Sequence, residues 1–370
     1  MRTATIAINP TALTHNLNQV KKLAPNAKVL AMVKANAYGH GIKTVLPALQ
    51  QADGIGVASF AEALEARQLG WDKTIGLIEG VFSASEWQQA INNAFSCVIH
   101  HTPQLDWALE NVPPVDNPTR QIWIKYNTGM NRLGFNDEAL ILAAQRLHDA
   151  GYQLILATHF ANADDRDHPL NTVQKKRFAD MINYLKNTIS PDIQGSLCNS
   201  AGIVNFASNH YDWVRPGIML YGSSPVTDQS AADLNLQPAM DFSAQIMAFQ
   251  TVNIGDAIGY GSGWIAKQET KTALVSIGYG DGYPRVINGD AYVCVIDTNS
   301  NQSYVCPVRG RVAMDMIVID ISQAPTDIAL NSKVILWGVM PHVDEVAVHA
   351  GTTGYELLCR LSARPERTQV

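Results

Sequence analysis

The run Val29-Leu30-Ala31-Met32-Val33-Lys34-Ala35-Asn36-Ala37-Tyr38-Gly39-His40-Gly41 carries the clearest fold signal of the chain. Five apolar residues precede Lys34, and a glycine-containing turn follows it. An unbroken apolar run of this length is typical of a strand buried on both faces, as in a parallel sheet. Burial favours the neutral, nucleophilic form of a lysine amine, so Lys34 is a candidate for chemistry. The structural alternative is a lysine whose ammonium reaches solvent at the strand end.

Composition indicates a globular protein with more than one core. The chain has 370 residues, of which 46% are hydrophobic and 16% charged, and this length favours two domains. A net charge of -6 argues against nucleic acid and anionic membranes as partners. The five cysteines lie far apart without metal-ligand spacing, which predicts no metal site and a reduced, cytoplasmic setting. No apolar run matches a signal peptide or a membrane span.

Short apolar segments alternate with amphipathic stretches over the first part of the chain. The candidate strands are 29–35, 54–59, 75–80, 96–100, 121–127, 154–161, 195–200 and 213–222. Two of the intervening helices begin with a capping-box pattern, Ser59 with Glu62 and Ser83 with Glu86. Repeated strand–helix units imply a parallel sheet, and eight of them predict an α/β fold of the TIM (β/α)8 barrel type. A doubly wound sheet is the alternative.

The alternation of strand and helix patterns stops near residue 238. Alternating β-type segments joined by Gly, Asp and Asn turns follow at 239–251, 272–279, 292–296, 311–321 and 333–337, and 343–361 has a helical pattern. We therefore predict a barrel over residues 9–237 and a mainly β domain over 238–370, to which residues 1–8 add a strand. The tail 363–370 matches no element and is expected to be disordered.

Polar residues recur where the predicted barrel strands end. In a TIM barrel, chemistry takes place at the C-terminal ends of the strands. The residues at these ends are Lys34, Arg132, His159, Asn199, Ser200 and Arg215. Singly, His159 fits a hydrogen-bonded core histidine, and Arg132 and Arg215 fit surface positions. Together on one rim, they favour a binding site.

The end of the eighth strand adds a phosphate signal. Loops after strands seven and eight of this fold commonly bind phosphate through backbone N–H groups and short hydroxyl side chains. Ser200 and the backbone of Gly217 and Ile218 suit that role. A phosphate site beside a buried lysine points to pyridoxal 5'-phosphate (PLP) bound covalently to Lys34.

Motifs along nearly the whole chain resemble those of the bacterial alanine racemases, PLP-dependent enzymes of fold type III. The matching stretches, in order, are 31–41 (AMVKANAYGHG), 128–134 (TGMNRLG), 158–161 (THFA), 199–202 (NSAG), 214–217 (VRPG), 258–261 (IGYG), 278–283 (GYGDGY) and 310–316 (GRVAMDM). One such motif would be a weak signal, whereas this many in register are a strong one.

The resemblance implies a role for each matched residue and a head-to-tail homodimer with shared active sites. Lys34 and Tyr260 would be catalytic. Tyr38, Ser200, Tyr355 and the backbone of Gly217 and Ile218 would hold the cofactor phosphate, beside Asn199. Arg215 would face the pyridine nitrogen and bond to His159. Tyr260 and Met314 would come from the other subunit. Arg132 and the Met314 N–H would bind the substrate carboxylate, and Lys125 matches a position that is carbamylated in some members.

The implied activity is the racemisation of alanine by two bases, Lys34 on one face of the α-carbon and Tyr260 on the other. It would supply D-alanine for peptidoglycan or serve alanine catabolism, and the residues do not separate these two roles. A racemase of broader amino-acid specificity is the alternative. A PLP-binding protein without turnover lacks the second domain, and a related decarboxylase needs no proton donor on the opposite face.

Overall fold

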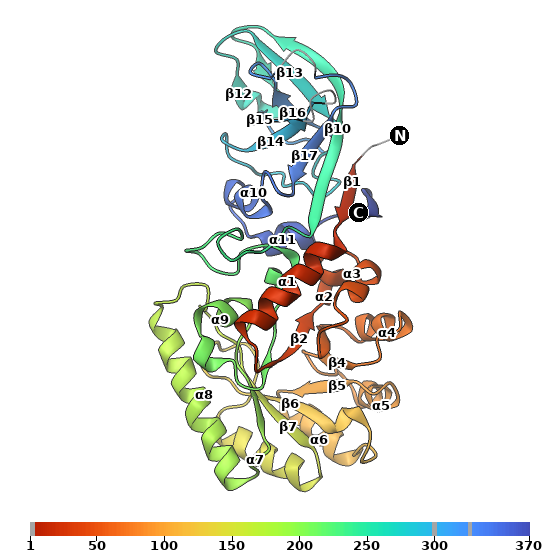
Figure 1. The fold of residues 1–370 in the computed structure, drawn as a ribbon, viewed down its shortest axis with the longest axis vertical. Helices are drawn as coiled ribbons and strands as arrows, with labels where there is room; N and C mark the ends of the chain where they lie inside the picture. Colours follow the sequence, from red (N-terminus) through yellow and green to blue (C-terminus); the bar gives the residue numbers. More distant parts are fainter. Residues whose placement is uncertain (1–3, 298–301, 325–327) are drawn as a thin grey trace.

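A closed barrel of parallel strands forms the lower part of the molecule in Figure 1, and the predicted fold class is confirmed. The computed structural model describes residues 4–297, 302–324 and 328–370. The strand order is β8-β7-β6-β5-β4-β3-β2-β9. The strands are β2 (Lys28–Met32), β3 (Gly54–Val57), β4 (Thr74–Leu77), β5 (Ser96–Ile99), β6 (Gln121–Lys125), β7 (Gln153–Ala157), β8 (Gln194–Ser196) and β9 (Trp213–Val214).

Each strand ends earlier than its sequence pattern predicts, and the difference matters at β2. That strand ends at Met32, so Lys34 and Ala35 lie beyond it rather than within it. The barrel closes between β8 and β9, where the backbone N–H of Arg215 donates to the Cys198 carbonyl at 2.9 Å. The strands are buried on both faces, as an all-apolar pattern predicts.

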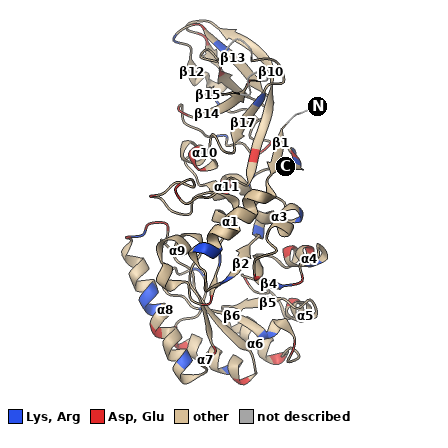
Figure 2. Cartoon of the chain, in the orientation of Figure 1, with Lys and Arg blue, Asp and Glu red and all other residues tan. Residues whose placement is uncertain are grey.

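Helices cover the outside of the barrel, and residues of both charges recur along them (Figure 2). They are α1 (Pro10–Leu23), α3 (Ile42–Ala48), α4 (Phe60–Gln68), α5 (Ala84–Asn92), α6 (Thr102–Glu110), α7 (Asp137–Asp149), α8 (Pro169–Thr188) and α9 (Ser200–Asn205). The predicted capping box of Ser59 and Glu62 forms at α4. At α5, Ser83 caps as expected, but the Glu86 carboxylate accepts the Phe82 N–H instead of that of Ser83.

A second sheet forms the upper part of the molecule in Figure 1, in the order β13-β16-β15-β14-β17-β10-β1-β18. Its strands are β1 (Thr5–Ile8), β10 (Met240–Val252), β13 (Thr270–Val275), β14 (Tyr292–Ile296), β15 (Ser303–Arg309), β16 (Ile317–Asp320), β17 (Lys333–Trp337) and β18 (Glu366–Gln369). As expected, β1 adds to this sheet by antiparallel pairing with β10. The domain limits 9–237 and 1–8 with 238–370 stay a prediction.

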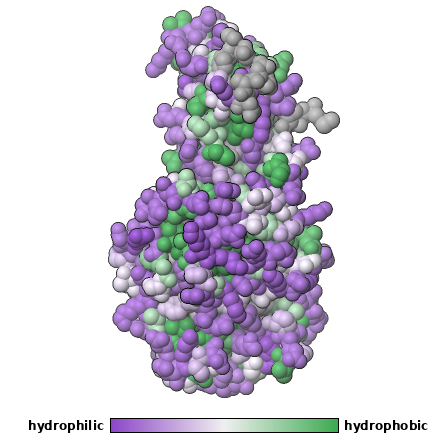
Figure 3. Space-filling view, viewed as in Figure 1, coloured by the Kyte–Doolittle hydropathy of each residue, from purple (hydrophilic) through white to green (hydrophobic). Residues whose placement is uncertain are grey.

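The sequence patterns missed several elements of this part. The tail is not disordered, because β18 pairs in parallel with β1. β15 and the small hairpin of β11 (Ala257–Ile258) and β12 (Trp264–Ile265) were not predicted. The predicted helical stretch 343–361 is divided into α10 (Val343–Ala350) and α11 (Gly354–Cys359). Hydrophilic side chains cover most of the visible barrel surface (Figure 3). Within the described ranges, no helix is long and apolar enough to cross a membrane.

The start of α10 docks on the loop that follows β9. Asp344 accepts hydrogen bonds from the Ser223 hydroxyl and, at 2.9 Å, from the Ser224 N–H. His342 Nε2 lies 3.0 Å from the Gly222 carbonyl, and its Nδ1 lies 3.2 Å from both the Asp344 carboxylate and the Asp344 N–H. A neutral ring would cap the helix, whereas a protonated ring pairs with the carboxylate. This joint fixes α10, and with it α11, against the barrel.

The contact between the start of α10 and the loop after β9 predicts that the stability of the protein depends on pH. Burial alone would lower the pKa of His342, but the bond to Asp344 outweighs it and raises this pKa above its ordinary value. The stabilisation from protonated His342 is therefore complete below about pH 6.5 and is lost as the pH rises through the folded-state pKa. The pKa of Asp344 is lowered despite its burial, so its contribution is lost only in acid. Thermal unfolding of His342→Asn, which keeps a capping side chain, should show less loss of stability between about pH 6 and pH 8 than the parent. An equal loss in both proteins would contradict the assignment.

Candidate active site

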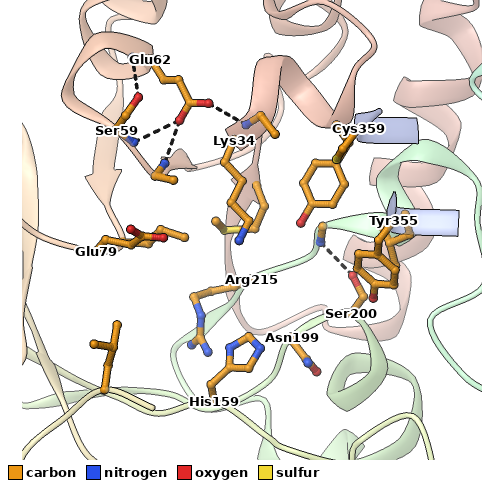
Figure 4. Close-up of a pocket in the computed structure, with 18 of the residues that line it drawn as sticks. Lys34, Ser59, Glu62, Glu79, His159, Asn199, Ser200, Arg215, Tyr355 and Cys359 are labelled. Atoms are coloured by element: carbon orange, nitrogen blue, oxygen red, sulfur yellow. Dashed lines mark hydrogen bonds between the residues drawn. The ribbon is translucent and has the colours of Figure 1, made fainter. Parts of the chain in front are cut away.

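The C-terminal ends of the barrel strands open into a cavity of about 790 Å³, a size suited to a small-molecule ligand. The sequence-predicted residues that line it are Lys34, Tyr38, Arg132, His159, Asn199, Ser200, Arg215, Gly217, Ile218 and Tyr355. The lining also includes Glu62, Glu79, Lys125 and Cys359. Figure 4 shows the Lys34 side chain extending into the cavity above Arg215 and His159.

Lys34 begins an unusual backbone turn. The segment α2 (Lys34–Tyr38) is a left-handed turn, with φ of +52° at Ala35 and Asn36, +53° at Ala37 and +51° at Tyr38. For residues other than glycine this conformation costs roughly 1–2 kcal/mol each. Strain of this kind persists only where the surrounding structure fixes it, and it is common at functional sites.

Side-chain contacts fix the far end of this turn. Asn36 Oδ1 accepts the Ile42 N–H at 2.9 Å, and the Gly41 N–H donates to the Asn36 carbonyl. The His40 ring bonds to the Tyr38 carbonyl through Nδ1 at 2.9 Å. Burial lowers the pKa of His40 to about 4, so the ring is neutral at physiological pH. The same ring packs on Tyr221, at 4.6 Å between centroids.

Arg215 is buried at the base of the cavity, where backbone carbonyls hold it. Its guanidinium donates to the Ser196 carbonyl at 2.9 Å, to the Thr158 carbonyl at 2.5 Å and to the Ser196 hydroxyl. Burial lowers its pKa to about 10, so it remains a cation near neutral pH. Within the described residues the predicted hydrogen bond to His159 does not form, because these carbonyls take the guanidinium donors instead.

Positive charge accumulates in the cavity. Burial, followed by the charges of Arg215, Arg132 and Lys34, lowers the pKa of Lys125 well below its ordinary value. Burial and the same cations, together with Lys125, also lower the pKa of His159 well below its usual range. His159 is therefore a neutral imidazole. Such an arrangement suits an anionic ligand, which would relieve the repulsion among the cations.

One end of the cavity is built from hydroxyl groups. The Ser200 Oγ accepts the Gly217 N–H at 2.8 Å. The Tyr38 ring stacks on Tyr221 with centroids 4.8 Å apart. Burial raises the pKa of both Tyr38 and Tyr355, so these phenols keep their protons and can donate hydrogen bonds. A Cβ at Gly217 would lie 2.5 Å from the Tyr38 hydroxyl, so glycine is required there for the ring to reach the cavity.

Two of the predicted residues are not brought to this cavity by the chain itself. Tyr260 and Met314 are 73% and 52% exposed, and neither lines the cavity. Tyr260 lies between β11 and β12, at the end of the second sheet far from the barrel in Figure 1. A single chain therefore provides Lys34 without the proposed second base.

Sequence reasoning assigned no site role to Glu62, Glu79 or Cys359. Glu62 was visible only as a capping residue of α4, and Glu79 follows β4 at the strand end where polar residues were expected. Cys359 enters the cavity through α11, whose position depends on the second part of the chain. Only the strand-end rule could have indicated Glu79, and no sequence signal indicated Cys359.

The close approach of α11 to the Lys34 turn predicts a strong effect of one methyl group. Gly39 has φ of +79°, and a Cβ there would lie 2.0 Å from the Leu358 carbonyl oxygen. Gly39→Ala should lower the free energy of unfolding by roughly 2–4 kcal/mol, from backbone strain and overlap together. Gly70, with φ of +91° and no neighbouring atom within 4 Å, is the matched control. In denaturant unfolding, Gly70→Ala should cost only about 1–2 kcal/mol. Equal losses would show that α11 does not pack as described.

Comparison with known proteins identifies the family. The family model described as alanine racemase, N-terminal domain, matches residues 8–225, and the one described as alanine racemase, C-terminal domain, matches residues 239–369. The chain is 54% identical to an alanine racemase of Psychrobacter sp. (strain PRwf-1) over 99% of both chains. It is 40% identical to the biosynthetic alanine racemase of Pseudomonas aeruginosa, again over 99% of both.

Solved structures agree with this result. The alanine racemase from Acinetobacter baumannii matches with a TM-score of 0.92 and 47% identity over 100% of both chains. The alanine racemase from Bartonella henselae with covalently bound pyridoxal phosphate matches with a TM-score of 0.86 and 25% identity, also over 100% of both. Together, the matched domains, the full-length relatives and the shared fold show that this chain belongs to the alanine racemase family.

Proposed function

We propose that this chain interconverts L- and D-alanine with PLP attached to Lys34, and that Tyr260 of a second copy completes each active site. Alanine racemisation itself follows from the family. The observation that carries the residue assignment is the cavity, which places a half-buried lysine between a hydroxyl-lined end and a buried arginine. A second copy is required because Tyr260 lies outside this cavity.

The cavity suits PLP in both charge and donors. Lys34 supplies the amine for attachment, as the covalent PLP of the Bartonella henselae relative suggests. The hydroxyls of Tyr38, Ser200 and Tyr355 line the end where a phosphate would lie, with the Gly217 and Ile218 backbone beside them and Asn199 nearby. Bound PLP withdraws electrons from the α-carbon of an attached amino acid and so makes its proton acidic enough to remove.

Arg215 would determine whether the ring nitrogen of bound PLP is protonated. Its guanidinium is held by carbonyls of the barrel wall and remains protonated, so it can donate a hydrogen bond to a ring nitrogen but cannot readily transfer the proton. By keeping its proton, Arg215 would leave the ring nitrogen of bound PLP unprotonated and so would limit side reactions. The neutral imidazole of His159 lies beside Arg215 in Figure 4 without adding another positive charge.

Two residues act as bases, one on each face of the substrate α-carbon. Lys34 removes or returns the α-proton on one face, and Tyr260 of the second copy does so on the other. Arg132 and the Met314 N–H hold the substrate carboxylate, with Met314 contributed by the second copy. Tyr260, Met314 and the nearby Ile265 are exposed on one chain, which is expected if they become buried in a homodimer.

The physiological setting follows from the relatives rather than from the geometry. We propose a biosynthetic role, supplying D-alanine for peptidoglycan, because the biosynthetic Pseudomonas aeruginosa enzyme aligns over 99% of both chains. A cytoplasmic location remains our prediction, and the five free cysteines support it. A racemase of broader amino-acid specificity is the alternative function.

The attachment site is tested by reductive trapping. Borohydride reduction of the holoenzyme should fix pyridoxal phosphate on the peptide that contains Lys34, as read by mass spectrometry. Lys34→Ala should abolish trapping and lower kcat by at least about 10³-fold, because it removes both the attachment point and one base. A Lys43→Ala variant, whose lysine lies on the barrel surface helix α3, should behave like the parent. Label on another lysine would refute the assignment.

The shared site is tested by mixing two inactive variants. Lys34→Ala and Tyr260→Phe should each lose racemisation as homodimers. If Lys34 and Tyr260 of one site come from different copies, a mixed dimer contains one intact site. Subunit exchange at equal concentrations should then restore about a quarter of parent activity. Failure to recover, with mixed dimers verified by mass, would place both residues in one copy.

A further inference from the structure

The turn after Lys34 is held at its start by a carboxylate from the neighbouring strand–helix unit. Glu62 Oε1 accepts the Ala35 N–H at 2.6 Å. Glu62 Oε2 accepts the Ala58 N–H at 2.9 Å and the Ser59 N–H at 3.1 Å. One side chain thus ties the backbone after β2 to the backbone after β3, as the dashed lines in Figure 4 show.

The two carboxylate oxygens of Glu62 bond to different parts of the chain. Oε2 completes the capping box of α4 through the Ser59 N–H and also accepts the Ala58 N–H of the same loop. Oε1 has no part in the cap and bonds only across to the Lys34 turn. A residue needed solely for capping would leave that second oxygen to solvent.

The next strand–helix unit shows what capping alone looks like. Ser83 accepts the Glu86 N–H at 3.1 Å, as Ser59 accepts that of Glu62 at 3.3 Å. The Glu86 carboxylate accepts the Phe82 N–H at 2.7 Å, within its own loop. In the described chain, Glu86 makes no bond to the turn after a neighbouring strand. Of the two capping glutamates, Glu62 is therefore the one whose carboxylate links two strand–helix units.

Holding the Ala35 N–H orients Lys34 itself. The peptide group that carries this N–H begins at the Lys34 carbonyl, and Val33 on the other side of Lys34 is held by its N–H bond to the Gly56 carbonyl. Holding both sides restrains ψ of Lys34 and the direction in which its side chain leaves the backbone. The four residues that follow Lys34 are left-handed, a conformation that costs free energy and persists only where the surrounding structure holds it. A hydrogen bond to a charged acceptor is stronger than one between neutral groups, so it suits this role.

We propose that Glu62 is a positioning residue for Lys34, and that its Oε1 bond to the Ala35 N–H holds the left-handed turn that aims the Lys34 amine into the cavity. The proposal rests on the function proposed for Lys34. Since acid–base steps depend on placement to within about 1 Å, loosening this bond should reduce turnover more than substrate binding.

The test compares Glu62→Gln with Glu86→Gln in the holoenzyme. The amide of Glu62→Gln turns an NH₂ group toward backbone N–H groups on one side. We expect kcat to fall about tenfold with KM within about twofold, and hydrogen exchange of the backbone at residues 33–41 to rise about tenfold. Glu86→Gln should lose a similar amount of thermal stability through its cap while leaving kcat and exchange at 33–41 unchanged.

A second variant keeps the test decisive if Glu62→Gln folds poorly. Glu62→Asp retains an acidic residue in the first turn of α4 but is one methylene too short to reach both loops, so it should give the same change in kcat and exchange. Parent-like exchange at 33–41 in the Glu62 variants, or an equal loss of kcat in Glu86→Gln, would overturn the proposal. Exchange is read without reference to Lys34 chemistry, so failure of the Lys34 assignment would appear separately, in the borohydride experiment.

Discussion

The burial of Arg215 at the seam of the barrel is the constraint on which the site depends. Its backbone N–H closes the ring of strands at Cys198, and its guanidinium is anchored by the carbonyls of Ser196 and Thr158. A buried cation with neutral acceptors is tolerated only when those acceptors are well placed. The ends of β7 and β8 are therefore fixed around the Arg215 guanidinium. This guanidinium adds positive charge to the cavity above it. The cost of burying this charge is offset when an anionic ligand is bound.

Most of the barrel could be predicted from sequence because its strands are buried on both faces and separated by capped helices. The barrel-rim residues followed from the same pattern, since the ends of parallel strands meet at one edge. The second sheet was harder to predict. β18 is exposed throughout, so it lacks the alternation on which a strand prediction relies, and β15 contains Pro307, a residue that argues against a strand. Tyr260 and Met314 were found only through resemblance to a family.

The left-handed turn lay beyond any local pattern. Ala35 and Ala37 have no preference for the left-handed region, and the apolar run before them indicated a strand that includes Lys34. The start of the turn is held from elsewhere in the chain, by Glu62, whereas Asn36 and His40 of the turn and its flank hold the end. Tertiary hydrogen bonds have overridden local preference at the residue that matters most for chemistry. Sequence reasoning detects a cap such as Glu62, but it cannot reveal that the second oxygen of that cap serves another loop.

The pairing of β1 with β18 has a consequence for how the molecule is made. β1 begins at residue 5 and β18 ends at residue 369, and the two lie side by side in one sheet. β18 follows every other described strand in the chain, so during synthesis one edge of β1 has no neighbour until β18 emerges. Such open edges are the places where nascent chains associate wrongly. The polar, exposed side chains of β18 then form the border of the sheet, so the pairing of β18 with β1 also protects this edge from further strands.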